Sequence, residues 1–189
     1  MNLPNKLTIA RLFLTALFVA AMSVPWLPQR YTLALALFLI AAITDFLDGY
    51  LARRSDLVTD FGKLMDPLAD KILTGSVFII LSAEGLIPAW CTILIISREF
   101  LVTGLRLIAS SQGSVVSADR LGKWKTTLQI ITACYFLVSL GREEWLLRIL
   151  APLYTLPALG AVLIAATVII TTVSGLTYLR NNRQLVRSF

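Results

Sequence analysis

The sequence predicts an all-α polytopic membrane protein with six transmembrane helices in a single domain, residues 1–189. Hydrophobic residues make up 57% of the chain and charged residues only 15%, and the mean hydropathy of +0.79 lies outside the range of soluble proteins. The apolar residues also gather into six runs, each close to the roughly 20 residues that a helix needs to cross a bilayer.

The first three runs cover residues 7–24, 31–53 and 62–82. Pro25 and Pro28 break the helix after the first run, and Trp26 between them suits a membrane interface. The second and third runs are separated by the short polar link 54–60, which predicts a tight hairpin of two helices.

The last three runs cover residues 90–110, 121–140 and 150–179. Gly141 directly follows the fifth run and is well placed as a helix C-cap. The final run contains Pro152 and Pro157 near its start, so it is either one long helix with an irregular entry or a short re-entrant piece followed by a span. We favour one span, which brings the total to six.

The composition excludes several kinds of chemistry. The chain has no histidine, so Ser-His-Asp and Cys-His triads and His-ligated metal sites are absent. Cys91 and Cys134 both lie inside apolar runs and are expected to be core residues rather than a disulfide or a metal pair. The net charge of +6 is expected to reflect basic cytoplasmic ends and anionic phosphate ligands rather than nucleic acid.

Basic residues favour one orientation in the membrane. If the hairpin around residues 45–70 faces the cytoplasm, that side carries Lys6, Arg11, Arg53, Arg54, Lys63, Lys71, Arg98, Arg106, Arg120, Lys123, Lys125, Arg180, Arg183 and Arg187. Only Arg30, Arg142 and Arg148 remain outside. The positive-inside rule then places both termini and the hairpin on the cytoplasmic side of the cell's inner membrane.

Four aspartates in this hairpin are spaced for a metal site. Asp45 and Asp48 are three residues apart, and Asp66 and Asp70 are four apart, so on two helices each pair shares one face. Carboxylates packed this closely in a low-dielectric site do not all stay ionised unless a cation compensates them. Oxygen ligands without histidine or thiolate favour one or two Mg²⁺, Mn²⁺ or Ca²⁺ ions over Zn²⁺.

Small residues beside the aspartates leave room for a bulky ligand. Gly49 and Ala52 continue the helical row that begins at Asp45, so a nucleotide can approach the backbone there. Arg53 closes that row and is suited to pair with a phosphate, and Gly62 lies one turn before the second aspartate pair.

The full pattern, D-x2-D-G-x2-A-R-x8-G-x3-D-x3-D, resembles the signature of the CDP-alcohol phosphotransferases, integral membrane enzymes of phospholipid synthesis. The resemblance implies six transmembrane helices, usually in a homodimer, with a polar cavity open to the cytoplasm. It implies that Asp45, Asp48, Asp66 and Asp70 bind Mg²⁺ or Mn²⁺, with Asp70 also the catalytic general base. The residues implied for CDP binding are Asp48, Gly49, Ala52, Arg53 and Gly62.

Further stretches resemble the family branch that transfers the phosphatidyl group of CDP-diacylglycerol to glycerol 3-phosphate. They begin at Asn2, Ser97 and Gly122. A dianionic acceptor phosphate needs cations beyond Arg53, because Arg binds phosphate bidentately and Lys adds a point charge. The cations expected to bind it are Arg98, Arg106, Lys123, Lys125 and Arg11.

Arg98 and Glu99 fall about halfway along the fourth run, where an unpaired charge is costly. Either they face the polar site or their helix extends beyond the bilayer.

Two other functions also remain open at this point. One is the same chemistry with another acceptor, such as inositol phosphate, because charge argues against serine but not against inositol phosphate. The other is a cation transporter, which leaves Gly49, Ala52 and Arg53 unexplained.

Overall fold

The computed structural model describes residues 3–52, 60–111, 120–154 and 157–182, which form helices joined by turns, without a β-strand. The helices are α1 (Leu3–Ser23), α2 (Arg30–Ala52), α3 (Asp60–Ala83), α4 (Ala89–Ser111), α5 (Arg120–Leu140), the 3-10 helix η1 (Leu147–Tyr154) and α6 (Pro157–Asn181). The first five α-helices match the first five predicted runs to within a few residues at each end.

The last predicted run, for which an irregular entry or a separate short piece had been left open, is divided in the structure into a short helix and one long helix. The 3-10 helix η1 comes first, and α6 begins only at Pro157. The division has a local cause: a proline has no backbone N–H to donate and is favoured in the first turn of a helix, so Pro157 starts α6.

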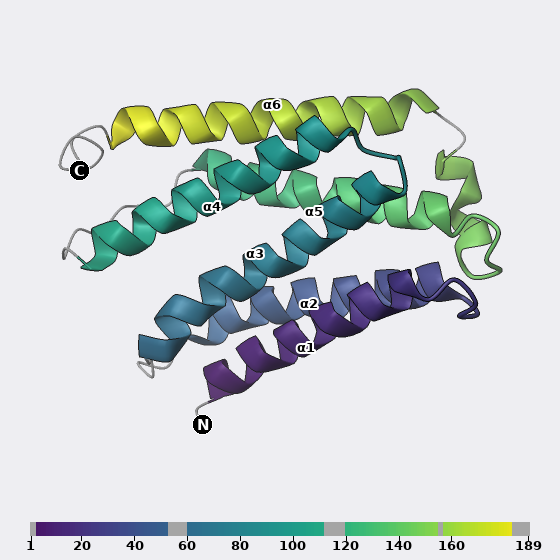
Figure 1. Cartoon of the computed structure of the whole chain (residues 1–189), viewed down its shortest axis with the longest axis horizontal. Coiled ribbons are helices and arrows are strands. Elements are labelled where there is room, and N and C mark those ends of the chain that lie inside the picture. The colour runs from purple at the N-terminus through teal and green to yellow at the C-terminus, as the bar shows by residue number, and fades with distance from the viewer. Residues whose placement is uncertain (1–2, 53–59, 112–119, 155–156, 183–189) are drawn as a thin grey trace.

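The six α-helices lie side by side, and the chain passes back and forth along the bundle (Figure 1). The start of α1 and the end of α6 lie at one end of the bundle. The turns from α1 to α2 and from α3 to α4 lie at the opposite end, together with η1. This alternation places residues that are far apart in sequence at the same depth in the bundle.

Apolar packing fills the half of the bundle next to those turns. Helix α1 packs on α2 and α3, while α6 packs on α4 and α5. Phe18, Phe38, Phe78 and Leu137 are buried there, on four different helices. The buried charged residues lie nearer the other end, so the bundle has an apolar half and a polar half.

Two glycines mark sharp turns at the apolar end. Gly85 has a φ of 74° and ends α3 in a Schellman motif, in which Leu86 N–H donates to Leu81 O and Gly85 N–H to Ser82 O. Gly141 ends α5, as predicted, but it is not in the left-handed conformation of a C-cap glycine. A glycine is needed there because a Cβ would lie 2.3 Å from Leu147 Cδ1 and 2.9 Å from Tyr31 Cβ.

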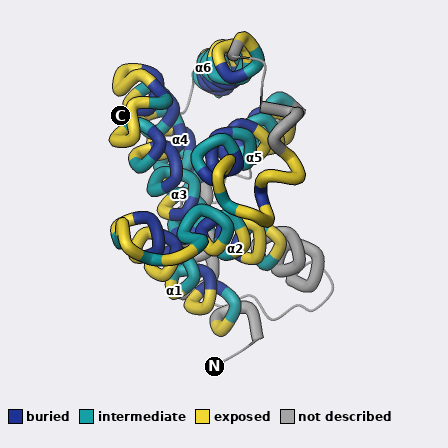
Figure 2. The backbone as a smooth tube through the Cα atoms, turned by 90° about the vertical axis from the view of Figure 1, so that its right-hand side faces the viewer, coloured by how far each residue is buried: buried dark blue, intermediate teal, exposed yellow. Residues whose placement is uncertain are grey.

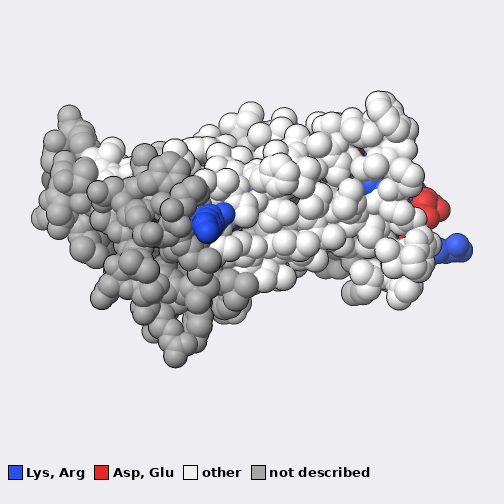
Figure 3. All heavy atoms as spheres, turned by 90° about the horizontal axis from the view of Figure 1, so that it is seen from below, with Lys and Arg blue, Asp and Glu red and all other residues white. Residues whose placement is uncertain are grey.

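The outer surface is rich in apolar side chains. Within the described residues, Lys6–Ser23 and Ala158–Asn181 are long and apolar enough to cross a membrane, and Arg30–Thr44 is a shorter apolar segment. Every α-helix carries exposed large apolar residues, such as Phe13, Ile79 and Ile169. In Figure 2 the exposed residues lie on the outward faces of the helices. In Figure 3 few charges interrupt the described part of the face on the α1–α2 side.

Candidate active site

The aspartate motif lies on two helices, as the spacing predicted. Asp45 and Asp48 lie near the end of α2, and Asp66 and Asp70 lie in the first half of α3. Gly49 and Ala52 belong to α2 and Gly62 to α3, while Arg53 lies outside the described residues. Of the four aspartates, only the Asp70 side chain is described.

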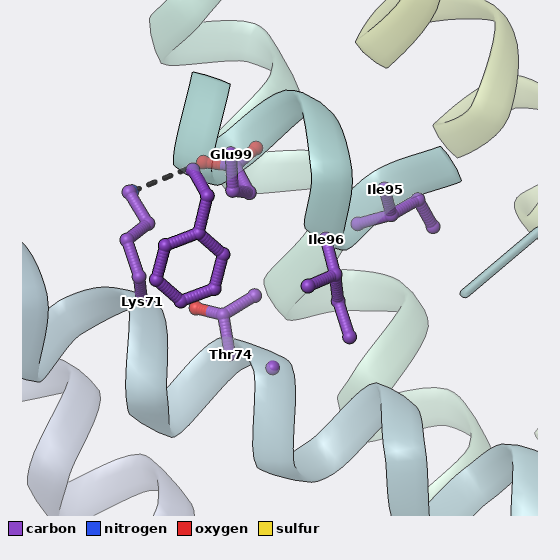
Figure 4. Close-up of a pocket in the computed structure, with 7 residues that line it drawn as sticks. Lys71, Thr74, Ile95, Ile96 and Glu99 are labelled. Carbon is purple, nitrogen blue, oxygen red and sulfur yellow. Dashed lines mark ion pairs between the residues drawn. The ribbon is translucent and has the colours of Figure 1, made fainter. Parts of the chain in front are cut away.

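Asp70 is partly buried and paired with its neighbour in the sequence. The ammonium group of Lys71 lies 2.5 Å from Asp70 Oδ2 and 3.1 Å from Glu99 Oε2. Figure 4 shows the Lys71 side chain extending from α3 toward Glu99 on α4, beside a narrow recess that Thr74 and Ile96 also line. Lys71 therefore links the aspartate motif to the middle of α4.

Glu99 is the centre of an ionic cluster between three helices. Its side chain is only 5% exposed. Lys125 of α5 forms an ion pair and a hydrogen bond with Glu99 Oε1, and Gln129 Nε2 donates to the same oxygen over 3.2 Å. Arg98 Nη1 also lies 3.4 Å from that oxygen. A buried carboxylate is tolerated only when it is paired and hydrogen-bonded in this way.

Arg98 and Arg106 lie between α4 and α6. Arg98 Nη2 donates a 2.7 Å hydrogen bond to Ser174 Oγ, and the Arg106 guanidinium lies 5.4 Å from the centroid of the Tyr178 ring. A guanidinium at that distance over an aromatic face makes a cation–π contact. The mid-helix charges of α4 therefore face the interior of the bundle, which resolves the alternative of a helix extending beyond the bilayer for Arg98 and Glu99.

The other two cations predicted for acceptor binding are Arg11 and Lys123. Arg11 of α1 is almost completely buried. Lys123 is exposed near the start of α5, whereas Lys125 is buried. Two residues are separated by about 200° around a helix, so Lys123 and Lys125 point to different sides of α5. Of the predicted cations, the structure thus groups Arg98, Arg106 and Lys125 with the ion pair of Asp70 and Lys71.

The donor chemistry of the motif fits a hard divalent cation. Carboxylate oxygens are the preferred protein ligands of Mg²⁺ and Mn²⁺. Within the part of the chain that the structure describes, no three Asp, Glu, Cys or His residues gather as a metal site. The side chains of Asp45, Asp48 and Asp66 lie outside that part, so the predicted metal ligands remain a prediction from the sequence.

Five residues of the cluster were not among the predicted site residues: Lys71, Glu99, Gln129, Ser174 and Tyr178. Two signals were available. Lys71 follows Asp70 directly, and Glu99 is an acid in the middle of an apolar run. Ser174 and Tyr178 gave no signal, because serine and tyrosine are unremarkable in an apolar helix. Only the packing of α6 on α4 brings them to the arginines.

Comparison with known proteins places this site in context. Residues 1–173 match the CDP-alcohol phosphatidyltransferase family. A CDP-diacylglycerol–glycerol-3-phosphate 3-phosphatidyltransferase of Bacillus subtilis is 47% identical over 72% of this chain and 77% of its own length. A protein of the same name from Rickettsia felis is 37% identical over 95% of this chain and 94% of its own. A probable phosphatidylglycerophosphate synthase of Mycobacterium tuberculosis is 38% identical over 94% and 79%.

Proposed function

The chain belongs to the CDP-alcohol phosphatidyltransferase family, and from this premise we propose that it transfers the phosphatidyl group of CDP-diacylglycerol to glycerol 3-phosphate. The products are phosphatidylglycerol phosphate and CMP. The relatives from Bacillus subtilis and Rickettsia felis carry this activity in their names. The observation that carries the proposal here is the group of cations beside Asp70: Lys71, Arg98, Arg106 and Lys125.

These cations suit a phosphate-bearing acceptor. Within the described cluster, Lys71, Arg98 and Lys125 share the one carboxylate of Glu99, and Asp70 contacts Lys71. Arg106 adds a further positive charge, so this group carries an excess of two positive charges. A dianionic phosphate compensates that excess, whereas zwitterionic serine does not.

In the proposed reaction, the primary hydroxyl of glycerol 3-phosphate attacks the β-phosphorus of CDP-diacylglycerol. Asp70 accepts the hydroxyl proton, a new P–O bond forms to glycerol, and the bond between the β-phosphorus and CMP breaks. The aspartates Asp45, Asp48, Asp66 and Asp70 would hold one or two Mg²⁺ or Mn²⁺ ions, whose charge would neutralise the pyrophosphate and stabilise CMP as it leaves. Gly49, Ala52, Arg53 and Gly62, together with Asp48, would line the CDP site.

The same proposal includes the setting of the enzyme. It is a single catalytic domain of six spans in the cell's inner membrane, with the site and both termini facing the cytoplasm, and it works as a homodimer. Three features support the membrane setting: the two clearly apolar helices, the exposed apolar residues on every helix, and the alternating course of the chain.

The test is CMP release by the purified full-length protein in detergent. CDP-diacylglycerol is supplied with Mg²⁺ or Mn²⁺, and glycerol 3-phosphate, inositol phosphate or serine is offered separately. We expect release that requires glycerol 3-phosphate, stops with EDTA and returns when the metal is restored. Release with inositol phosphate alone would retain the aspartate chemistry but replace the acceptor. Failure with every acceptor would favour the transporter.

A further inference from the structure

Helix α6 touches both arginines of α4 in the polar half of the bundle. Helices α4 and α6 run in the same direction and pack on each other (Figure 1). Ser174 and Tyr178 are four residues apart, so they lie on one face of α6. Ser174 contacts Arg98 and Tyr178 contacts Arg106, which means that one face of α6 meets both guanidinium groups.

The contacts are close and buried. Ser174 is 2% exposed and Tyr178 is 4% exposed. Gly175 lies beside them, and a Cβ at that position would come within 3.0 Å of Arg98 Cγ. The absence of a side chain at Gly175 therefore leaves room for the Arg98 stem against α6, and Ser174 holds the end of the same side chain.

Within the described residues, Glu99 is the one carboxylate paired with these arginines, through Arg98. Its charge is shared, because Glu99 also contacts Lys71 and Lys125. Arg98 Nε and Arg106 Nε are buried without a hydrogen-bond partner in the structure as described. Buried donors are almost always paired in native proteins, so these two unpaired guanidinium donors on α4 indicate a place prepared for an anion.

We propose that Ser174 and Tyr178 of α6 are positioning residues for the acceptor: they hold Arg98 and Arg106 in the orientation in which the pair binds the acceptor phosphate. This inference rests on the proposed function, because it takes glycerol 3-phosphate as the ligand of the arginines. Both residues lie outside residues 1–173, so the family match gives them no role.

The Ser174 hydroxyl and the Tyr178 ring do different work. The hydroxyl accepts a hydrogen bond from a charged group, so Ser174→Ala removes it, while Ser174→Thr keeps a hydroxyl at the same position. The aromatic face is what Arg106 contacts, so Tyr178→Leu removes the contact and Tyr178→Phe keeps it. Thr172 is a matched control on α6, because its hydroxyl donates only to Val168 O within the same helix.

The experiment measures KM separately for glycerol 3-phosphate and for CDP-diacylglycerol with full-length protein in detergent. Loss of a hydrogen bond to a charged group is expected to raise the KM for glycerol 3-phosphate about tenfold in Ser174→Ala. Tyr178→Leu should also raise it several-fold, at roughly the value of a buried cation–π contact. Ser174→Thr, Tyr178→Phe and Thr172→Ala should stay near the wild type, and the KM for CDP-diacylglycerol should not change.

A second readout does not depend on turnover. Glycerol 3-phosphate should raise the thermal unfolding midpoint of the wild type and of Thr172→Ala, and raise it less in Ser174→Ala and Tyr178→Leu at the same concentration. An unchanged KM and undiminished protection in those two variants would overturn the role of α6 while leaving the proposed function intact. If the wild type neither uses nor is protected by glycerol 3-phosphate, the proposed function fails, and this inference fails with it.

Discussion

Asp70 and Glu99 are two carboxylates with different surroundings, from which we infer that they have different tasks. The Asp70 side chain is 24% exposed and contacts Lys71 alone among the described cations, so it remains accessible to a substrate hydroxyl. Glu99 is enclosed by Lys71, Lys125, Arg98 and Gln129. Because Glu99 contacts all four of these side chains, we infer that its task is to hold them in position.

We expect Asp70→Asn to lower the rate of CMP release by roughly 10²–10⁴-fold, the usual contribution of a general base. The amide is nearly the same size, so CDP-diacylglycerol binding should be partly retained. The measurement is CMP release alongside binding of CDP-diacylglycerol, with the exposed Glu84→Gln as the control for loss of an acid. If Asp70→Asn releases CMP at nearly the wild-type rate, Asp70 is not the general base.

We expect Glu99→Gln to lower the free energy of unfolding by about 3–5 kcal/mol, because removing one partner of a buried ion pair leaves its cations uncompensated. The three cations concerned are Lys71, Arg98 and Lys125. Denaturant unfolding in detergent measures the change, and Glu84→Gln again provides an exposed control. Equal stability of the two variants would show that Glu99 does not hold the cluster together.

At the scale of elements, the helix ends are tied together across the bundle. Glu144, in the turn after α5, accepts hydrogen bonds from the backbone N–H groups of Tyr31 at 2.9 Å and Thr32 at 2.8 Å. Its carboxylate thereby caps the N-terminus of α2, where a negative charge also complements the helix dipole. In the sequence, Glu144 was only part of a polar link between two runs.

We expect Glu144→Ala to destabilise the protein by about 0.5–2 kcal/mol, the range measured for loss of an N-cap. Glu143→Ala is the matched control, because Glu143 is next in the chain, has a side chain that is 90% exposed and contacts only Arg142 at the surface. Thermal unfolding of both variants in detergent decides the point. A control that is as unstable as Glu144→Ala would mean that the helix cap contributes nothing.

For the whole molecule, the alternating course of the helices places different turns at the two ends of the bundle. Trp26, Trp90 and Trp145 are all exposed, and all lie in or beside turns at the end opposite the start of α1. Tryptophan favours the membrane interface, so these residues agree with a six-span arrangement. The charge bias of the sequence predicts that this end lies outside the cytoplasm.

That orientation predicts which positions a membrane-impermeant thiol reagent reaches in intact cells. In a background with Cys91→Ala and Cys134→Ala, we expect Glu143→Cys to be labelled in intact cells and Lys6→Cys only after permeabilisation. Both native residues are exposed and lie near opposite ends of the bundle. The reverse labelling pattern would invert the topology, and labelling of both in intact cells would exclude six spans.

The fold was largely predictable, because helix periodicity and breaking residues are local. The first five helices, the aspartate pairs on α2 and α3, and the end of α5 at Gly141 were all predicted. The division of the last run into η1 and α6 was not, because two prolines in an apolar run are compatible with either outcome. The need for a glycine at position 141 was also not predictable from local sequence, because Leu147 and Tyr31 fill the space that a side chain there would occupy.

The sequence by itself determined which chemistry is present: four carboxylates at helical spacing, no histidine, an excess of cations and apolar runs of membrane length. Only the tertiary structure decided which of these groups meet. Glu99 reaches Lys125 across 26 residues of chain, and Arg98 reaches Ser174 across 76. Such contacts depend on the rotation and depth at which one helix packs against another, and that geometry is decided by the packing of the whole bundle rather than by any single segment.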